Sequence, residues 1–216
     1  MHRTMAVDGL TQVRNRRSLQ EMLGTEISRS RRHLHRLCLL LIDVDRFKEI
    51  NDQHGHLGGD HVLQRIAAQL ARQARREDCV ARYGGDEFAI VMPETDRGGA
   101  LVFGERLRGA VEQGEIRFGE ATVQVTISVG VAEWSPNMTR PEDLIAAADV
   151  SLYEAKHAGR NRVAGEPQAE RAGCASWGGV LAWTSSLPGS RSAWRARCRG
   201  CAPPAPRAAR GSPRTR

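Results

Sequence analysis

Acidic residues at three places in the chain have the types and spacing to act on a metal ion and a phosphate. Asp43 ends a run of apolar residues, with Asp45 just behind it. Asp86 and Glu87 stand side by side in the phrase RYGGDEF, and Asp60 closes a stretch rich in glycine. Adjacent carboxylates on a turn repel each other unless a bound cation or substrate compensates their charge. A Gly-Gly-Asp-Glu phrase alone is more often a solvated turn, so its meaning depends on the elements that carry it.

Two strand patterns are expected to bring these carboxylates together. Residues 37–42 are continuously apolar and too short for a typical helix, which indicates a strand covered on both faces and ending at Asp43. Residues 79–81 and 88–92 predict a hairpin, in which Gly84 and Gly85 supply the positive φ of a tight turn. If strand and hairpin are neighbours in one sheet, Asp43 and Glu87 converge. Oxygen ligands that meet in this way suit Mg²⁺, which takes further ligands from water and substrate phosphates.

The remaining pattern alternates helices and strands. Helical spacing predicts helices that start near residue 15 and end in the basic run 29–36, and further ones at about 46–52, 60–75, 100–113 and 141–159. Gly55, Gly58 and Gly59 are expected in a loop, with Asp60 as the N-cap of the helix that follows. Residues 122–132 are expected to form one strand. We therefore predict an α+β fold in which helices cover a mixed sheet of about five strands.

Three basic residues complete the candidate chemistry. Lys48, Lys156 and Arg160 are candidate phosphate contacts, the last two at the end of a helix. With the carboxylates they point to metal-assisted nucleotidyl transfer, in which a metal bridges a phosphate and the attacking hydroxyl. The structural alternative is that Lys156 and Arg160 only satisfy the last carbonyls of their helix.

Composition bears on partners and location. The net charge of the 216 residues is +7, and residues 166–216 carry all of it, with nine Arg, no Lys and two Glu. Residues 1–165 are neutral overall, so no nucleic-acid partner is expected for the folded part. The five cysteines do not suggest a disulfide framework in a chain of this length, and Cys198 and Cys201 lack a second pair for zinc. No apolar run reaches membrane-spanning length, so a cytoplasmic protein is expected.

Five phrases of the sequence resemble those of the GGDEF family of diguanylate cyclases. They are DGLTQVRNRR (8–17), DVDRFKEINDQHGHLGGD (43–60), RYGGDEF (82–88), ISVGVA (127–132) and ADVSLYEAKHAGRNR (148–162). They occur in the family's order, and the match covers about residues 5–164. The resemblance implies an adenylyl-cyclase-like fold with a ferredoxin-like core, a mainly antiparallel sheet and a central hairpin that carries the signature. Residues 165–216, rich in Ala, Arg, Gly and Pro, are expected to be a disordered tail.

The resemblance also implies an activity, a metal and an assembly. Two GTP molecules would be condensed into cyclic di-GMP with release of two pyrophosphates. The metal would be Mg²⁺ or Mn²⁺, held by Asp43 and Glu87 with the backbone carbonyl of Val44. Asp86 resembles the second acid of the signature, which is needed for catalysis. Each domain would hold one GTP, so the reaction would require a homodimer.

Further residues match the family's substrate and product contacts. Asn51 and Asp60 resemble the residues that read guanine, and either could otherwise be an ordinary turn or cap residue. Gly84 and Gly85 would let the backbone approach the nucleotide. Lys48, Lys156 and Arg160 resemble the contacts to the β- and γ-phosphates.

An R-x-x-D phrase, formed by Arg75 and Asp78, lies five residues before Gly84. In the family this phrase forms an inhibitory site for cyclic di-GMP, and Arg106 is a candidate secondary contact from another helix. Feedback inhibition by the product is therefore expected.

Competing interpretations stay open at this point. Seven residues precede Asp8, and we expect from this no sensor, receiver or coiled-coil segment to pair two domains. A weakly active or inactive fragment that binds GTP or cyclic di-GMP is one alternative, which the intact signature disfavours. A different class III-like nucleotidyl cyclase is disfavoured by Asn51 and Asp60. Nucleic-acid binding through the Arg-rich tail is a third alternative, and would be lost on truncation at Gly165.

Overall fold

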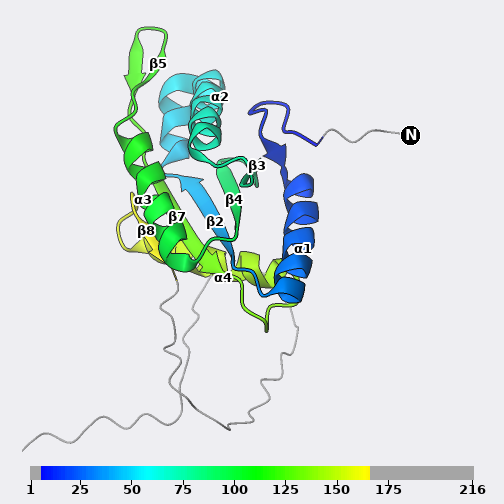
Figure 1. The fold of residues 1–216 in the computed structure, drawn as a ribbon. Coiled ribbons are helices and arrows are strands. Elements are labelled where there is room, and N and C mark those ends of the chain that lie inside the picture. The colour runs from blue at the N-terminus through cyan, green and yellow to red at the C-terminus, as the bar shows by residue number, and fades with distance from the viewer. Residues whose placement is uncertain (1–5, 166–216) are drawn as a thin grey trace, which may run out of the picture. The chain divides into compact units, whose positions relative to one another are not determined.

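The computed structural model of this chain describes residues 6–165. Within them a six-stranded sheet has the order β1-β3-β4-β2-β7-β8, and helices cover both of its faces (Figure 1). The predicted α+β class is confirmed, with one strand more than the five expected. The predicted tail lies outside the described residues except for Gly165, which ends β8.

The elements follow one another as β1 (Arg14–Asn15), α1 (Arg16–His33), β2 (Leu37–Val44), α2 (Phe47–Gln73), β3 (Cys79–Arg82), β4 (Glu87–Pro93), α3 (Arg97–Glu112), β5 (Ile116–Phe118), β6 (Ala121–Val123), β7 (Ile127–Glu133), α4 (Pro141–His157) and β8 (Val163–Gly165). Two boundaries differ from expectation. Helix α1 runs to His33, so much of the basic run 29–36 is helical. Helix α3 begins at Arg97, because the Asp96 carboxylate accepts a hydrogen bond from the Gly99 amide at 2.7 Å and caps the first turn.

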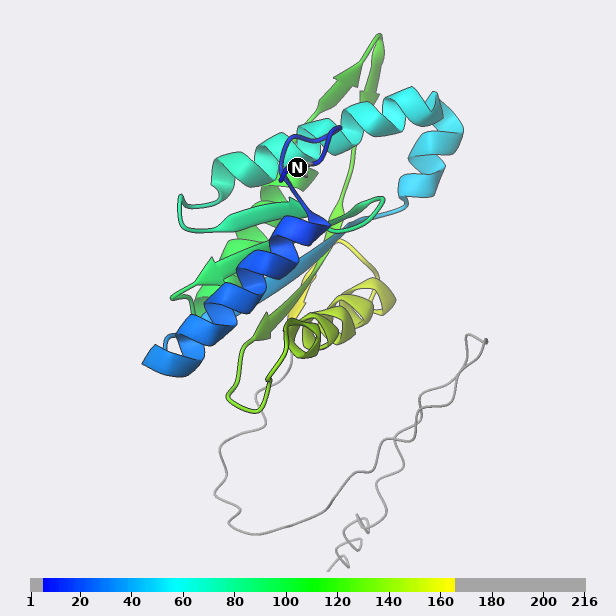
Figure 2. The ribbon, with the colours of Figure 1, turned by 90° about the vertical axis from the view of Figure 1, so that its right-hand side faces the viewer.

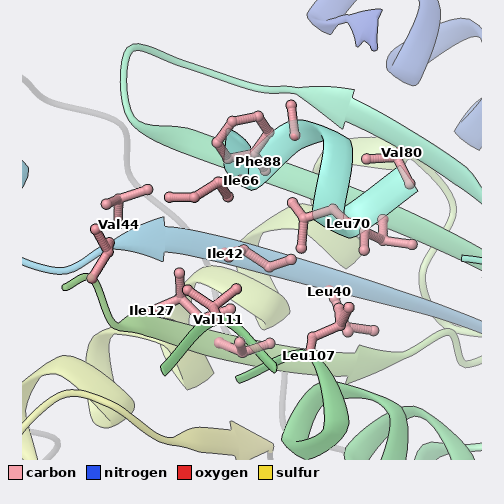
Figure 3. Close-up of a cluster of buried hydrophobic side chains, with 14 of the residues drawn as sticks. Leu40, Ile42, Val44, Ile66, Leu70, Val80, Phe88, Leu107, Val111 and Ile127 are labelled. Atoms are coloured by element: carbon pink, nitrogen blue, oxygen red, sulfur yellow. The ribbon is translucent and has the colours of Figure 1, made fainter. Parts of the chain in front are cut away.

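Strand β2 is the centre of the sheet, as its unbroken apolar sequence predicted. It pairs antiparallel with β4 on one side and with β7 on the other. Its alternate residues enter two different cores. Leu40 and Ile42 pack with α2 and α3 (Figure 3), whereas Leu39 and Leu41 pack with α1 and α4. Burial on both faces therefore fixes the position of the strand end that carries Asp43.

Helix α2 contains a sharp break that the sequence reading misplaced. Gly55 has φ 71° and ψ 171°, outside the helical region, while Gly58, Gly59 and Asp60 are helical. The expected loop ending in an N-cap at Asp60 is therefore wrong, because a single glycine in the left-handed region is enough to turn the chain. The two parts of α2 run in different directions as a result (Figure 2).

The expected single strand over 122–132 is also two elements. Residues 121–123 form β6, which pairs only with β5 in a separate two-stranded sheet, and β7 begins at Ile127. The β5–β6 hairpin projects from the body of the domain (Figure 1). β-branched residues continue through the break, so alternation alone did not reveal it.

Helix α4 presses directly on β7 at a glycine. A Cβ built at Gly130 would overlap the backbone of Ala148 and Leu152 and lie 2.7 Å from the Leu152 Cα. The absent side chain thus allows backbone contact between helix and strand. This close packing brings the C-terminal end of α4, with Lys156, against the end of β2.

Other findings concern cysteines and membranes. Cys38 and Cys79 are free and buried, as expected of small apolar residues, and burial raises the pKa of both thiols. Within residues 6–165 no helix combines the length and apolarity needed to cross a bilayer.

Candidate functional site

The end of β2 and the start of β4 bring the predicted carboxylates together. In the antiparallel register Asp43 lies directly opposite Glu87. The Val44 amide donates to the Asp86 carbonyl oxygen at 3.2 Å, which extends the pairing one step into the turn. Opposed residues of antiparallel strands have their Cβ atoms about 5 Å apart. The expected convergence of Asp43 and Glu87 is therefore what the sheet produces.

The turn that presents Asp86 and Glu87 is held by the first residue of the signature. The Arg82 guanidinium donates to the Gly85 carbonyl from Nη2 (2.8 Å) and Nε (3.1 Å), and to Asp8 Oδ1 from Nη1 (3.1 Å). Asp8 Oδ1 also accepts from the amide (2.9 Å) and hydroxyl (2.7 Å) of Thr11. Sequence reasoning gave Arg82 and Asp8 no such role. Opposite charges in two of the matched phrases were the signal that could have suggested it.

The two glycines of the turn do not have the backbone conformation that was expected of them. Neither Gly84 nor Gly85 has a positive φ, so the prediction of left-handed turn residues is wrong. A Cβ at Gly84 would lie 2.7 Å from Glu87 Oε2, whereas one at Gly85 would meet nothing within 4 Å. The Glu87 carboxylate thus folds back over Gly84. Four residues between the strands, 83–86, leave enough chain for the turn without left-handed backbone.

Lys156 forms an ion pair with the principal carboxylate of the site. Its Nζ lies 2.6 Å from Asp43 Oδ2. Burial raises the pKa of Asp43 to about 6; the Lys156 contact opposes this rise, and the charges of Asp86 and Glu87 add to it. The site therefore holds more negative charge than its own residues neutralise.

This donor set fits a hard divalent cation. Among residues 6–165 no three His, Cys, Asp or Glu side chains form a metal-binding cluster. Mg²⁺ is commonly held by one or two carboxylates, with substrate phosphates and water as further ligands. Asp43 and Glu87 supply that number, and a cation would favour the ionised form of Asp43, whose pKa is raised first by burial and then by the charges of Asp86 and Glu87.

Asp43→Asn is expected to stabilise the metal-free protein at pH 7.5. A carboxyl whose folded pKa is raised from 3.8 to about 6 is most favourable when protonated, and loses that stability as pH rises through this interval. Removing its charge should raise the free energy of unfolding by about 1–2 kcal/mol after allowance for solvent screening. Urea denaturation without metal at pH 7.5 and pH 5 measures this difference, which should shrink at the lower pH. A less stable Asp43→Asn protein at pH 7.5 would contradict it.

Asp45 lies beside Asp43 in sequence but belongs to a different network. It is buried, and it accepts hydrogen bonds from the Ser128 hydroxyl (2.7 Å), the Thr126 hydroxyl (2.8 Å) and the Asn161 amide (3.0 Å). Both oxygens of its carboxylate therefore already accept hydrogen bonds within the protein. Asp45, which the sequence placed beside Asp43 without a ligand role, joins the end of β2, the start of β7 and the segment after α4.

The break in α2 folds the part of the helix that carries Asn51 against the start of the part that carries Asp60. Asn51 belongs to the first part of the helix and Asp60 to the second. A Cβ at Gly59 would overlap Asn51 Oδ1, so Asn51 packs directly on the residue before Asp60. An amide can donate and accept hydrogen bonds and a carboxylate accepts them, as pairing with guanine requires.

The N-terminus of α2 faces the same strand end. The helix begins at Phe47, three residues after β2 ends, and no side chain caps it. Uncapped N–H groups at a helix start form a ready anion site. Lys48 in this first turn is exposed, as is Arg160 beyond α4. The candidate phosphate contacts thus come from two helix ends, with Lys156 already engaged by Asp43.

The R-x-x-D phrase forms a compact corner after α2. Asp78 Oδ2 accepts from the Arg75 amide at 2.8 Å, and buried Asp78 Oδ1 has no hydrogen-bond partner within residues 6–165. Burial raises the pKa of Asp78, which Arg75 and Arg106 partly offset. Arg106 donates to the Gln73 carbonyl at 3.5 Å and lies over the Phe103 ring. The structure therefore gathers all three predicted product-site residues, with an acceptor oxygen to spare.

Comparison with known proteins gives one consistent result. The family model described as "Diguanylate cyclase, GGDEF domain" matches residues 5–162. Diguanylate cyclase A of Treponema denticola is 40% identical over 127 residues, which are 59% of this chain and 34% of that protein. Response regulator PleD of Caulobacter vibrioides is 40% identical over 161 residues, or 74% of this chain and 36% of PleD.

A solved structure agrees in fold. The GGDEF domain of DgcB from Caulobacter crescentus, in complex with c-di-GMP, superposes with a TM-score of 0.72 at 31% identity, covering 76% of this chain and 95% of that one. The chain spans less than half the length of the curated relatives it matches.

Proposed function

This chain belongs to the GGDEF family of diguanylate cyclases, and from that premise we propose that it condenses two GTP molecules into cyclic di-GMP and two pyrophosphates. One observation carries the proposal: the sheet register sets Asp43 opposite Glu87, beside the uncapped start of α2. Paired carboxylates next to an anion site suit a metal-bound triphosphate. GTP as substrate places the reaction in the cytoplasm.

Asp43 and Glu87, with the Val44 carbonyl, would hold Mg²⁺ or Mn²⁺. When bound, such an ion neutralises charge on the phosphates and lowers the pKa of the attacking hydroxyl. The protein's own residues do the positioning. Asp86, on the same turn as Glu87, would take part in proton removal from that hydroxyl, and Gly84 and Gly85 would let the backbone of the turn approach the nucleotide.

The other contacts select and orient GTP. Asn51 and Asp60 would pair with the guanine edge. Lys48, Lys156 and Arg160 would contact the β- and γ-phosphates, and Lys156 would have to leave Asp43 to do so. A 3′-hydroxyl then attacks the α-phosphate of the other GTP, and pyrophosphate leaves. Because each domain holds one GTP, two copies of the domain must face each other, so we propose a homodimer as the reacting form.

Incubation of concentrated protein with GTP and Mg²⁺, followed by analysis for cyclic di-GMP, tests the proposal. We expect the product to form, and the rate per mole of protein to rise with protein concentration as the dimer forms. Glu87→Ala serves as the control for contaminating cyclases. GTP binding without product at any concentration would instead favour a binding module, and no binding would reject both.

Arg75→Ala is expected to relieve inhibition by added cyclic di-GMP. We propose that Arg75, Asp78 and Arg106 bind the product, because Asp78 keeps a buried acceptor oxygen and two arginines flank it. Loss of one charged contact should raise the inhibitory concentration by about tenfold or more. Initial rates with added product measure this. Arg76→Ala, which changes the exposed neighbouring arginine, is the matched control. Unchanged inhibition of the Arg75→Ala protein would refute the site.

A further inference from the structure

The segment that follows α4 has an unusual backbone. Gly159, Arg160 and Asn161 have φ values of 116°, 62° and 46°. The Arg160 amide donates to the Ala155 carbonyl (3.1 Å) and the Gly159 amide to the Lys156 carbonyl (3.4 Å), which closes the helix in a Schellman motif. Gly159 explains the first left-handed residue. Two further non-glycine residues in that region cost free energy, and persist only if their surroundings hold them.

Arg162 Nε donates to the Arg160 carbonyl at 3.0 Å, and Asn161 links the segment to two other elements. Its Oδ1 accepts from Arg108 Nη1 at 2.9 Å, and its Nδ2 donates to Glu112 Oε1 at 2.7 Å. Its backbone amide donates to the buried Asp45 carboxylate at 3.0 Å. Arg108 is in turn paired with Glu105 (2.7 Å) and Glu112 (2.8 Å). Asn161 therefore ties the segment to α3 through its side chain and to the end of β2 through its backbone.

These contacts bracket Arg160. Four residues before it, Lys156 contacts Asp43; one residue after it, Asn161 contacts Asp45. The Arg160 backbone is thus fixed on both sides to the strand end that carries the candidate metal ligand. Its guanidinium remains exposed. An arginine whose backbone is fixed loses less entropy when it binds a phosphate than one on a free chain.

We propose that Asn161 is a positioning residue, which holds Arg160 in the left-handed conformation that aims its guanidinium at the GTP phosphates. This inference rests on the proposed function. The observations behind it are structural: three successive left-handed residues, and the contacts of Asn161 to two separate elements. A role in stability alone would leave GTP affinity unchanged once the protein is folded.

Binding of 3′-deoxy-GTP with Mg²⁺, measured by calorimetric titration, tests the inference without turnover because the analogue lacks the attacking hydroxyl. Asn161→Ala and Asn161→Gly are both expected to weaken binding by about tenfold, the order expected for one charge-assisted phosphate contact. Glycine takes a positive φ freely, so Asn161→Gly removes the side-chain contacts without backbone strain. Wild-type affinity in Asn161→Gly would overturn the inference.

The double variant tests whether the effect passes through Arg160. Arg160→Ala alone should weaken binding by at least as much, and Asn161→Gly should add nothing further in that background, because coupled residues give non-additive effects. A further full tenfold loss in the double variant would overturn the inference. Steady-state kinetics should agree, with KM for GTP raised and kcat little changed in Asn161→Gly.

Leu23→Ala on α1 controls for general loss of stability. Leu23 is fully buried in the core that α1 and α4 share, and it lies on a different helix from Arg108 and Glu112, the partners of Asn161. The variant should melt at a lower temperature and bind 3′-deoxy-GTP like the wild type. If it weakens binding as much as Asn161→Gly does, the inference is overturned. If the wild-type protein itself binds no GTP, the proposed function fails. If the wild type binds and Asn161→Gly binds equally well, only the positioning role of Asn161 fails, so the two outcomes are distinguishable.

Discussion

Glu87→Gln is expected to lower the rate of cyclic di-GMP formation by about a thousandfold. Glutamine keeps the shape of the side chain and removes the charge that faces Asp43 across the sheet register. Losing one of two carboxylate ligands should raise the activation barrier by about 4 kcal/mol, the equivalent of three factors of ten. Pyrophosphate release at saturating GTP and Mg²⁺ measures the rate.

Two comparisons make this result specific. Glu94→Gln changes an exposed glutamate that pairs loosely with Arg29 and His35, and should keep the wild-type rate. The Glu87→Gln protein should melt no lower than the wild type, since it removes a negative charge that raises the pKa of Asp43. A Glu87→Gln rate above a tenth of the wild type would show that this carboxylate does not hold the metal.

Gly130→Ala is expected to destabilise the fold by about 3–5 kcal/mol, enough to leave much of the protein unfolded or insoluble. The added Cβ would overlap backbone atoms of Ala148 and Leu152, and backbone cannot turn aside as a side chain can. Helix α4 would have to move off β7, and the packing of its buried stripe would be lost. Urea denaturation, or the soluble fraction on expression, measures the effect.

Gly109→Ala is the matched control in helix α3. A Cβ there would meet nothing within 4 Å, and alanine is the better helix former by about 0.5–1 kcal/mol. The same glycine-to-alanine change should therefore stabilise at 109 and disrupt at 130. Equal effects at the two positions would show that backbone contact between α4 and β7 does not limit residue 130.

The sequence was most informative where burial on both faces left no choice. The apolar run 37–42 indicated a strand covered on both faces, and the hairpin around residues 82–88 was considered as its neighbour in the sheet. On that condition Asp43 and Glu87 were expected to converge, and the register pairs them. Most helices were placed within a few residues, because their apolar spacing is regular.

The errors came from single residues whose effect depends on tertiary contacts. Three glycines near residue 57 looked alike, yet only Gly55 leaves the helical region, while Gly59 is small because Asn51 packs on it. Gly84 was expected to have a positive φ and does not; the Glu87 carboxylate folds over it instead. Local sequence does not contain the neighbour that makes a glycine necessary.

The different roles of the neighbouring carboxylates Asp43 and Asp45 were equally difficult to predict. Asp43 and Asp45 differ by two positions, so a strand pattern predicts that both side chains lie on one face. Instead Asp45 follows the strand's last residue and its carboxylate is filled by Ser128, Thr126 and Asn161. The donors come from residues more than eighty positions away, and no spacing in a single sequence indicates such a contact.

The Lys156–Asp43 pair places a positive charge beside the candidate metal ligand in the nucleotide-free protein. A metal ion that binds alone must displace the Lys156 ammonium from Asp43 without offering it another anionic partner. An ion that binds together with a triphosphate brings phosphate oxygens with which Lys156 can pair. We therefore expect the metal ion to replace the lysine as the positive charge beside Asp43. Mg²⁺ alone should bind weakly, and the Mg²⁺–nucleotide complex should bind strongly. The nucleotide, more than the ambient concentration of the ion, would then decide when the site is loaded.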